Sequence, residues 1–220
     1  MAGIGFELRR LLQQDSYLGL LRAYGYAGLI GSGPWILSIL AVMALGVIST
    51  ATQQAAAPWI TQFLVSVTWL VAASLITTGA IQLLFTRFVA DRLFEKRETS
   101  ILPNLLGLLS MVTLAAGFAG LAAMLGFRDT PLLYRVEMLV AFVLLCNIWC
   151  ITVFVAGVKA YRQVLGAFAL GYGTTLGLGL ALQGFKLEGL LGGFVVGQGV
   201  LLYSLLYRVI RDYPSQRLWA

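Results

Sequence analysis

Charged residues are scarce in this sequence, and histidine is absent. Of the 220 residues, 11% are charged and 60% are hydrophobic, and the mean hydropathy is +0.89. A soluble domain carries about 25% charged residues, so this chain lacks the polar side chains that would cover a water-soluble globule. The composition therefore excludes a soluble enzyme, a disordered chain and a disulfide-rich secreted module.

The lack of histidine and the presence of only two cysteines limit the chemistry further. Together they exclude a zinc finger and any metal site or catalytic triad built on histidine. Cys146 and Cys150 lie one helical turn apart, so they face the same way from one helix. We interpret them as small buried residues that pack between helices, because a redox or metal site would require further ligating residues nearby. The sequence thus predicts no enzyme activity, no cofactor and no metal.

Long runs without any charged residue divide the chain. These runs are 23–86, 99–127, 138–158, 163–185 and 189–207. A membrane-spanning helix needs about 20 apolar residues, so each of the last four runs suits one span. The first run suits two spans, with a polar break at 49–54 before Pro58. We therefore predict an all-α integral membrane protein, a six-transmembrane-helix bundle with spans at 25–48, 59–86, 104–126, 136–158, 164–183 and 188–207.

The segments that flank the predicted bundle are more polar. Over residues 1–24, apolar side chains and charged or amide side chains take opposite faces of a helix, which is typical of an amphipathic segment in the membrane interface. Residues 25–207 then form the transmembrane lobe. Residues 208–220 are expected to be a cytoplasmic tail or a linker to a second lobe.

Lysine and arginine are distributed unevenly between the two sides of the predicted spans. One side has Arg9, Arg10, Arg22, Arg87, Arg92, Lys96, Arg97, Lys159, Arg162, Arg208, Arg211 and Arg217, and the other has Arg128, Arg135 and Lys186. Cytoplasmic connections are enriched in these residues, so we expect both termini in the cytoplasm. The net charge of +6 then reflects membrane topology rather than nucleic-acid binding.

Glycines recur at helical spacing in the last two predicted spans. Gly189, Gly193 and Gly197 follow one another at steps of four, and Gly173 and Gly177 have the same spacing. Small residues at this spacing let helix backbones approach closely in lipid. We predict that these residues pack helices within the bundle. A subunit interface and a sliding surface in a transporter remain open alternatives.

The first predicted span contains Gly33, Pro34 and Trp35. Proline removes an amide donor and clashes with the preceding turn, so the helix should kink or begin anew there. Broken helices often line the sites of secondary transporters, which makes this span the best candidate for lining a cavity; a tolerated kink is the alternative. The ring of Trp35, like those of Trp69 and Trp149, could stack on sugars, although interfacial anchoring is the commoner use of tryptophan.

Few polar residues lie at membrane depth, and none near a predicted span centre is charged. The polar set is Gln62, Ser66, Thr77, Thr78, Gln82, Asn147 and Gln198. Without an intramembrane charge the sequence shows no ion-coupling site. Hydroxyl, amide and aromatic groups suit a neutral sugar better than an ion, so Gln62, Ser66, Thr77, Gln82 and Asn147 are further candidate cavity residues. Interhelical hydrogen bonding is the structural alternative.

A connection of mixed charge follows the second predicted span. It contains the apolar pair Leu93 and Phe94 between acidic and basic residues. Such a connection is usually a solvated anchor. The exposed apolar pair also suits the docking of a cytoplasmic partner.

Several stretches are not generic membrane-helix sequence. They include MAGIGFELRRLL, LLRAYGYAGLIGSGPWILSI, FTRFVADRLFEKR, LEGLLGGFVVGQ and YPSQRL. These stretches resemble the PelG family, inner-membrane components of the Pel exopolysaccharide system of bacteria, and the resemblance runs from residue 1 to the C-terminus. The family is similar to the multidrug/oligosaccharidyl-lipid/polysaccharide flippase superfamily, whose members have twelve spans in two six-helix lobes. The resemblance implies that this chain is one lobe of a longer flippase-like transporter.

The resemblance also implies a function. It implies transport of Pel, a polymer rich in N-acetylgalactosamine, across the bacterial inner membrane. It further implies partnership with PelD, a cyclic-di-GMP receptor, with PelE, and with the cytoplasmic glycosyltransferase PelF. The family supplies no agreed catalytic motif to transfer. A non-conducting membrane scaffold that assembles the glycosyltransferase and regulatory subunits is the alternative, and a small-molecule exporter is a weaker third one.

Overall fold

The computed structural model describes residues 17–52, 57–95, 98–126, 130–157 and 161–212, and the regular elements in these ranges are all helical. The long helices are α2 (Tyr17–Thr52), α3 (Pro58–Phe94), α4 (Ile101–Met124), α5 (Leu132–Gly157), α6 (Tyr161–Leu182) and α7 (Lys186–Asp212). Two short 3-10 helices, η1 (Glu98–Ser100) and η2 (Gln183–Phe185), precede α4 and α7. The predicted all-α fold is confirmed.

Each predicted span coincides with one long helix, although several helices are longer than predicted. α2 begins at Tyr17, so residues 17–24 are helical and continuous with the first predicted span, and their place in the membrane interface stays a prediction. The rest of that segment, 1–16, lies outside the described residues. α3 continues to Phe94 and α7 to Asp212. Charged side chains mark the edge of an apolar span but do not end a helix, which is why the sequence placed these ends too early.

The protein is a multi-pass membrane protein. Five helical stretches in the described ranges are long and apolar enough to cross a membrane. The last of them, Arg162–Asp212, has 51 residues and runs through α6, η2 and α7. The count of six spans stays a prediction, as does a twelve-helix assembly.

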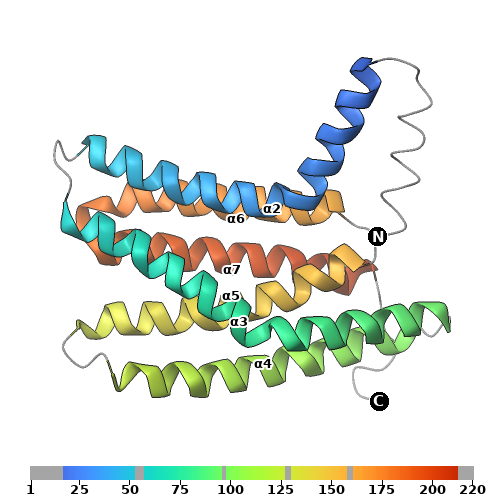
Figure 1. Ribbon diagram of the computed structural model, residues 1–220. Helices are drawn as coiled ribbons and strands as arrows, with labels where there is room; N and C mark the ends of the chain where they lie inside the picture. Colours follow the sequence, from blue (N-terminus) through green and yellow to red (C-terminus); the bar gives the residue numbers. More distant parts are fainter. Residues whose placement is uncertain (1–16, 53–56, 96–97, 127–129, 158–160, 213–220) are drawn as a thin grey trace.

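The long helices run antiparallel in chain order. Figure 1 shows that α2, α4 and α6 end, and α3, α5 and α7 begin, at one end of the bundle. The most extensive helix contacts are those of α6 with α7, α3 with α5, and α5 with α7. α5 and α7 therefore occupy the centre, while α2 packs mainly on α6 and α4 mainly on α5.

The core of the bundle centres on α5. Its residues 145–151 are all buried, including Cys146, Asn147 and Trp149. Burial around the whole circumference requires neighbours on every side, and α3, α4 and α7 supply them. Both cysteines are free and buried, as expected of residues that pack between helices. By contrast, α3 and α4 leave large apolar side chains such as Ile76 and Phe118 exposed, which suits a face turned to lipid.

α2 passes through Pro34 without ending. Figure 1 shows a sharp bend between the dark-blue start of this helix and its lighter-blue remainder. Pro34 is the one proline inside the helix, and its missing amide hydrogen explains a bend of this kind. The sequence left open whether the helix kinks or begins anew at Pro34, and the structure shows a kink. Beyond it, α2 lies along α6.

Cysteine labelling tests which end of the bundle faces the cytoplasm. Thr52 ends α2 at one end of the bundle, and Glu98 begins η1 at the other. In a background without Cys146 and Cys150, cysteine at Thr52 should react with a membrane-impermeant thiol reagent in intact spheroplasts, because its end has few lysines and arginines. Cysteine at Glu98 should react only after lysis. The reverse pattern would invert the expected orientation.

Candidate functional site

Polar side chains of α3 are hydrogen-bonded to α5 at three levels of the bundle. The Ser66 hydroxyl lies 2.8 Å from the Tyr134 hydroxyl, and the Trp149 indole Nε1 donates to the Ser74 hydroxyl over 2.9 Å. Further along α3, Thr77 contacts Cys146 of α5, with 3.8 Å between oxygen and sulfur. These contacts tie the two helices together through polar groups that lipid would leave unsatisfied.

Two of the three amides predicted to line a cavity also have partners inside the bundle. The Gln82 amide nitrogen donates to the Thr78 hydroxyl one turn earlier, over 2.8 Å. The Asn147 amide nitrogen donates to the Thr113 hydroxyl of α4 over 3.0 Å. Gln62 lies exposed on α3. The candidate cavity residues on α3 and α5 therefore do not form one polar wall; most take part in the hydrogen bonds that the sequence analysis left as the alternative.

Gln198 of α7 differs from these residues. Its side chain is fully buried, and within the described part of the chain neither amide atom has a hydrogen bond of good geometry. The hydroxyl of Tyr172 on α6 is directed toward Gln198 and toward Ser38 of α2. A buried amide without hydrogen bonds costs about 1–3 kcal/mol. The contact of α2, α6 and α7 thus encloses a buried amide that faces the Tyr172 hydroxyl without a hydrogen bond of good geometry among the described residues.

An aromatic cluster lies beside this polar group, formed by Trp35, Trp149, Phe168 and Tyr172. The rings of Trp35 and Trp149 stack with centroids 4.7 Å apart and planes 10° from parallel. Phe168 lies 6.4 Å from Trp149 and 6.0 Å from Tyr172. Trp149 is 4% exposed, whereas Trp35 is 40% exposed. The cluster therefore joins α2, α5 and α6 and reaches the surface through Trp35, next to Pro34 and the buried Gly33.

The predicted glycines of α7 lie against the backbone of α6. A Cβ atom on Gly193 would lie 2.6 Å from the backbone nitrogen of Gly179, and one on Gly197 would overlap the Thr175 hydroxyl. A Cβ on Gly189 would overlap the carbonyl oxygen of Leu182. At these three positions only glycine permits the observed approach of the helices.

The predicted glycines of α6 require a correction. Gly173 and Gly177 are exposed, and a Cβ on either would meet no other atom within 4 Å. The glycines of α6 that do contact α7 are Gly171 and Gly179, with Thr175 between them. Residues two positions apart on a helix point in nearly opposite directions. The repeat of Gly173 and Gly177 therefore lies on the face opposite the repeat of Gly171, Thr175 and Gly179, and the sequence analysis chose the first of the two. A contact of Gly173 and Gly177 with another subunit stays a prediction.

A comparison with protein families matches the whole chain, residues 1–220, to the family described as PelG, "Putative exopolysaccharide Exporter (EPS-E)". The chain belongs to the PelG family. This finding confirms the resemblance seen in the sequence and points to a transporter rather than an enzyme. Neither a search of curated proteins nor a search of solved structures found a match.

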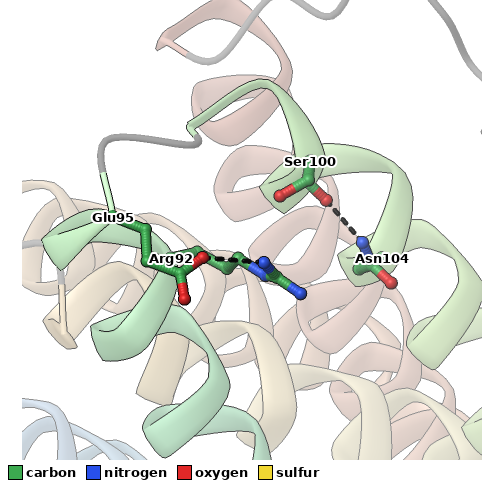
Figure 2. A network of polar contacts seen from close by, with 4 residues as sticks. All are labelled: Arg92, Glu95, Ser100 and Asn104. Carbon is green, nitrogen blue, oxygen red and sulfur yellow. Dashed lines mark hydrogen bonds and ion pairs between the residues drawn. The ribbon is translucent and has the colours of Figure 1, made fainter.

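The C-terminal end of α3 in this PelG-family chain presents Phe94, which is 90% exposed. The Arg92 guanidinium pairs with Glu95 over 2.9 Å and lies 5.1 Å from the centre of the Phe88 ring. Figure 2 shows this pair beside the amide of Asn104, which donates to the Ser100 carbonyl over 2.6 Å. The turn before α4 is therefore held by local bonds while Phe94 stays uncovered. The side chain of Leu93 lies outside the described residues.

Sequence reasoning missed several residues that the structure brings together in this PelG-family chain. Ser74 and Thr113 were not singled out because an isolated hydroxyl on an apolar helix carries no periodic signal. Tyr172 and Ser38 become notable only through their neighbours on other helices. A search for polar residues opposite aromatic ones could have suggested Ser74 and Trp149, but not their contact.

Proposed function

We propose that this chain is a polysaccharide-transport subunit that moves the N-acetylgalactosamine-rich Pel polymer across the bacterial inner membrane. Membership of an exopolysaccharide-exporter family and a multi-pass helical fold support this proposal. A neutral sugar needs apolar faces and hydrogen-bonding groups in one place, as small-molecule sites generally provide. The contact between α2, α6 and α7 offers both.

The observation that carries the proposal is the stacking of the partly exposed Trp35 on the buried Trp149. Trp35 follows directly after Pro34, so a change in the bend of α2 would shift this ring. Its exposed face offers a flat apolar surface to the C–H side of a sugar ring. The unused amide of Gln198 and the hydroxyls of Tyr172 and Ser38 offer hydrogen bonds close by. These groups support a sugar contact along α2.

Complementation of polymer export tests this site. Trp35→Ala should lower export several-fold at an unchanged level of membrane-inserted protein, because it removes the stacking surface. Trp35→Phe keeps a ring and should retain most of the export. Leu40→Ala is the matched control, since Leu40 is another exposed apolar residue of α2, 58% exposed. If Trp35→Ala and Leu40→Ala export equal amounts of polymer, Trp35 does not contact the sugar.

The exposed connection after α3 is proposed to dock a cytoplasmic partner, with PelD, PelE and PelF as the candidates. Replacing Leu93 and Phe94 by serine keeps the neighbouring charges that set topology and removes the exposed apolar side chain of Phe94. Membrane insertion should stay normal while co-purification of one of these partners falls. If all three partners co-purify at unchanged levels, the connection is a solvated anchor and does not dock any of them.

A non-conducting scaffold is the second candidate. It is favoured by one observation, the hydrogen bonding of Ser66, Gln82 and Asn147 within the lobe rather than around a polar path. A scaffold would tolerate Trp35→Ala and fail on the substitution of Leu93 and Phe94. A transporter would show the loss of export in Trp35→Ala with its partners still bound.

A further inference from the structure

A cavity of about 270 Å³ opens between α3, α4 and α5, away from the aromatic cluster. Small side chains create it, since Ala73 of α3 and Ala119 and Ala123 of α4 leave space that larger residues would fill. Trp69, which is 70% exposed, lies at its rim. Apart from Arg135 and the hydroxyl of Tyr134, the lining is apolar, and that hydroxyl is already bonded to Ser66. The cavity therefore suits a hydrocarbon chain rather than a sugar.

The cavity runs from one end of the bundle into the hydrocarbon region. On α5 its lining extends from Tyr134 in the first turn to Phe142, about 12 Å along the helix axis at 1.5 Å per residue. On α4 it covers the last two turns, which lie at the same end of the bundle. A water takes about 30 Å³ of liquid, and a methylene group is of similar size. The space thus holds a stretch of roughly nine methylene groups.

Arg135 supplies a charge at the end of the cavity. Its Nε atom is buried and has no hydrogen-bond partner among the residues that the structure describes. Within the described ranges no acidic side chain forms an ion pair with Arg135. The carboxylate of Glu137, two residues further, lies against Gly192 of α7, on another face of α5. A partly buried cation without a counter-ion is costly, so an anion is expected beside Arg135.

We propose that this cavity binds an anionic phospholipid, with one acyl chain between α3, α4 and α5 and the phosphate beside Arg135. The phosphate of a lipid lies at the membrane surface, where the first turn of α5 begins, and its chain descends into the hydrocarbon, as the apolar lining does. Basic side chains at such depths recognise anionic lipid headgroups. The site does not depend on the sugar path proposed above, because the two lie at different levels along α5 and otherwise use different helices.

Fluorescence quenching tests this site, because Trp69 reports on the cavity. The protein is reconstituted in vesicles of phosphatidylcholine that contain increasing fractions of lipid with brominated acyl chains. The Trp69 signal is the difference between the native protein and Trp69→Phe. Brominated phosphatidylglycerol should quench it at a mole fraction about tenfold lower than brominated phosphatidylcholine, a ratio equal to about 1.4 kcal/mol. Arg135→Gln should remove this preference, and Arg135→Lys should retain part of it.

A second pair of variants separates binding in the cavity from contact at the protein surface. Ala123 and Ala115 are both exposed alanines of α4, but only Ala123 lines the cavity. Ala123→Leu should lower quenching by both brominated lipids, whereas Ala115→Leu should behave as the native protein. Equal quenching of the native protein by both lipids would overturn the proposal. So would a preference that survives Arg135→Gln, or a Trp69 signal that neither lipid quenches, which would mean that protein fills the cavity.

Discussion

Replacing Gln198 by methionine is expected to raise the free energy of unfolding and, at the same time, to lower polymer export about tenfold. The side chain is fully buried, and its amide makes no hydrogen bond of good geometry with any other residue that the structure describes. Methionine has a similar length and no amide, so the variant avoids a desolvation cost of about 1–3 kcal/mol. Export should fall because the sugar loses a hydrogen-bonding group, and a tenfold change corresponds to about 1.4 kcal/mol.

Asn147→Leu is the contrasting variant. Asn147 is also buried, but its amide is bonded to Thr113 and to the Val143 carbonyl. Its replacement should lower the stability by about 1–3 kcal/mol, because those partners lose a bond. Thermal unfolding in detergent and export in complemented cells measure the two effects. A loss of stability in Gln198→Met would mean that the Gln198 amide is hydrogen-bonded in the membrane. Full export by this variant would mean that Gln198 does not contact the sugar.

The positions of the helices could be predicted from the sequence because lipid imposes a simple rule. Every backbone polar group in the hydrocarbon needs an internal partner, so an uncharged run of span length becomes a helix. Pro34 likewise predicts a bend from its own chemistry. The ends of α3 and α7 were predicted less well, since a helix continues into water after its apolar run stops.

The candidate site was only partly predictable, because it depends on which faces of different helices meet. The sequence identified Trp35 as an aromatic residue beside a kink, but not its stacking on Trp149. Ser66 and Asn147 were predicted to line a cavity, and their hydrogen bonds to neighbouring helices could not be foreseen without the packing. Asn147 and Gln198 look alike in sequence, and only their surroundings show that one amide is bonded and the other is not.

The α6–α7 contact should fail when a single methyl group is added at Gly193. A Cβ at this position would lie 2.6 Å from the backbone nitrogen and 2.8 Å from the Cα of Gly179. These are backbone atoms, so no side-chain rotation relieves the overlap and the two helices must separate. Overpacking costs about 1–3 kcal/mol. Gly193→Ala is therefore expected to lower the unfolding temperature and to abolish export, because α7 also carries Gln198 and packs on α5.

Gly177→Ala provides the matched control, since it adds the same methyl group to a helical glycine with no atom within 4 Å. Alanine is favoured over glycine inside a helix by about 0.5–1 kcal/mol, so this variant should be as stable as the native protein or slightly more stable. Size-exclusion chromatography and thermal unfolding in detergent compare the two variants. If Gly193→Ala unfolds at the native temperature, the α6 and α7 backbones do not touch at this level. If Gly177→Ala keeps its stability but loses export, its open face contacts another subunit, as the glycine repeat first suggested.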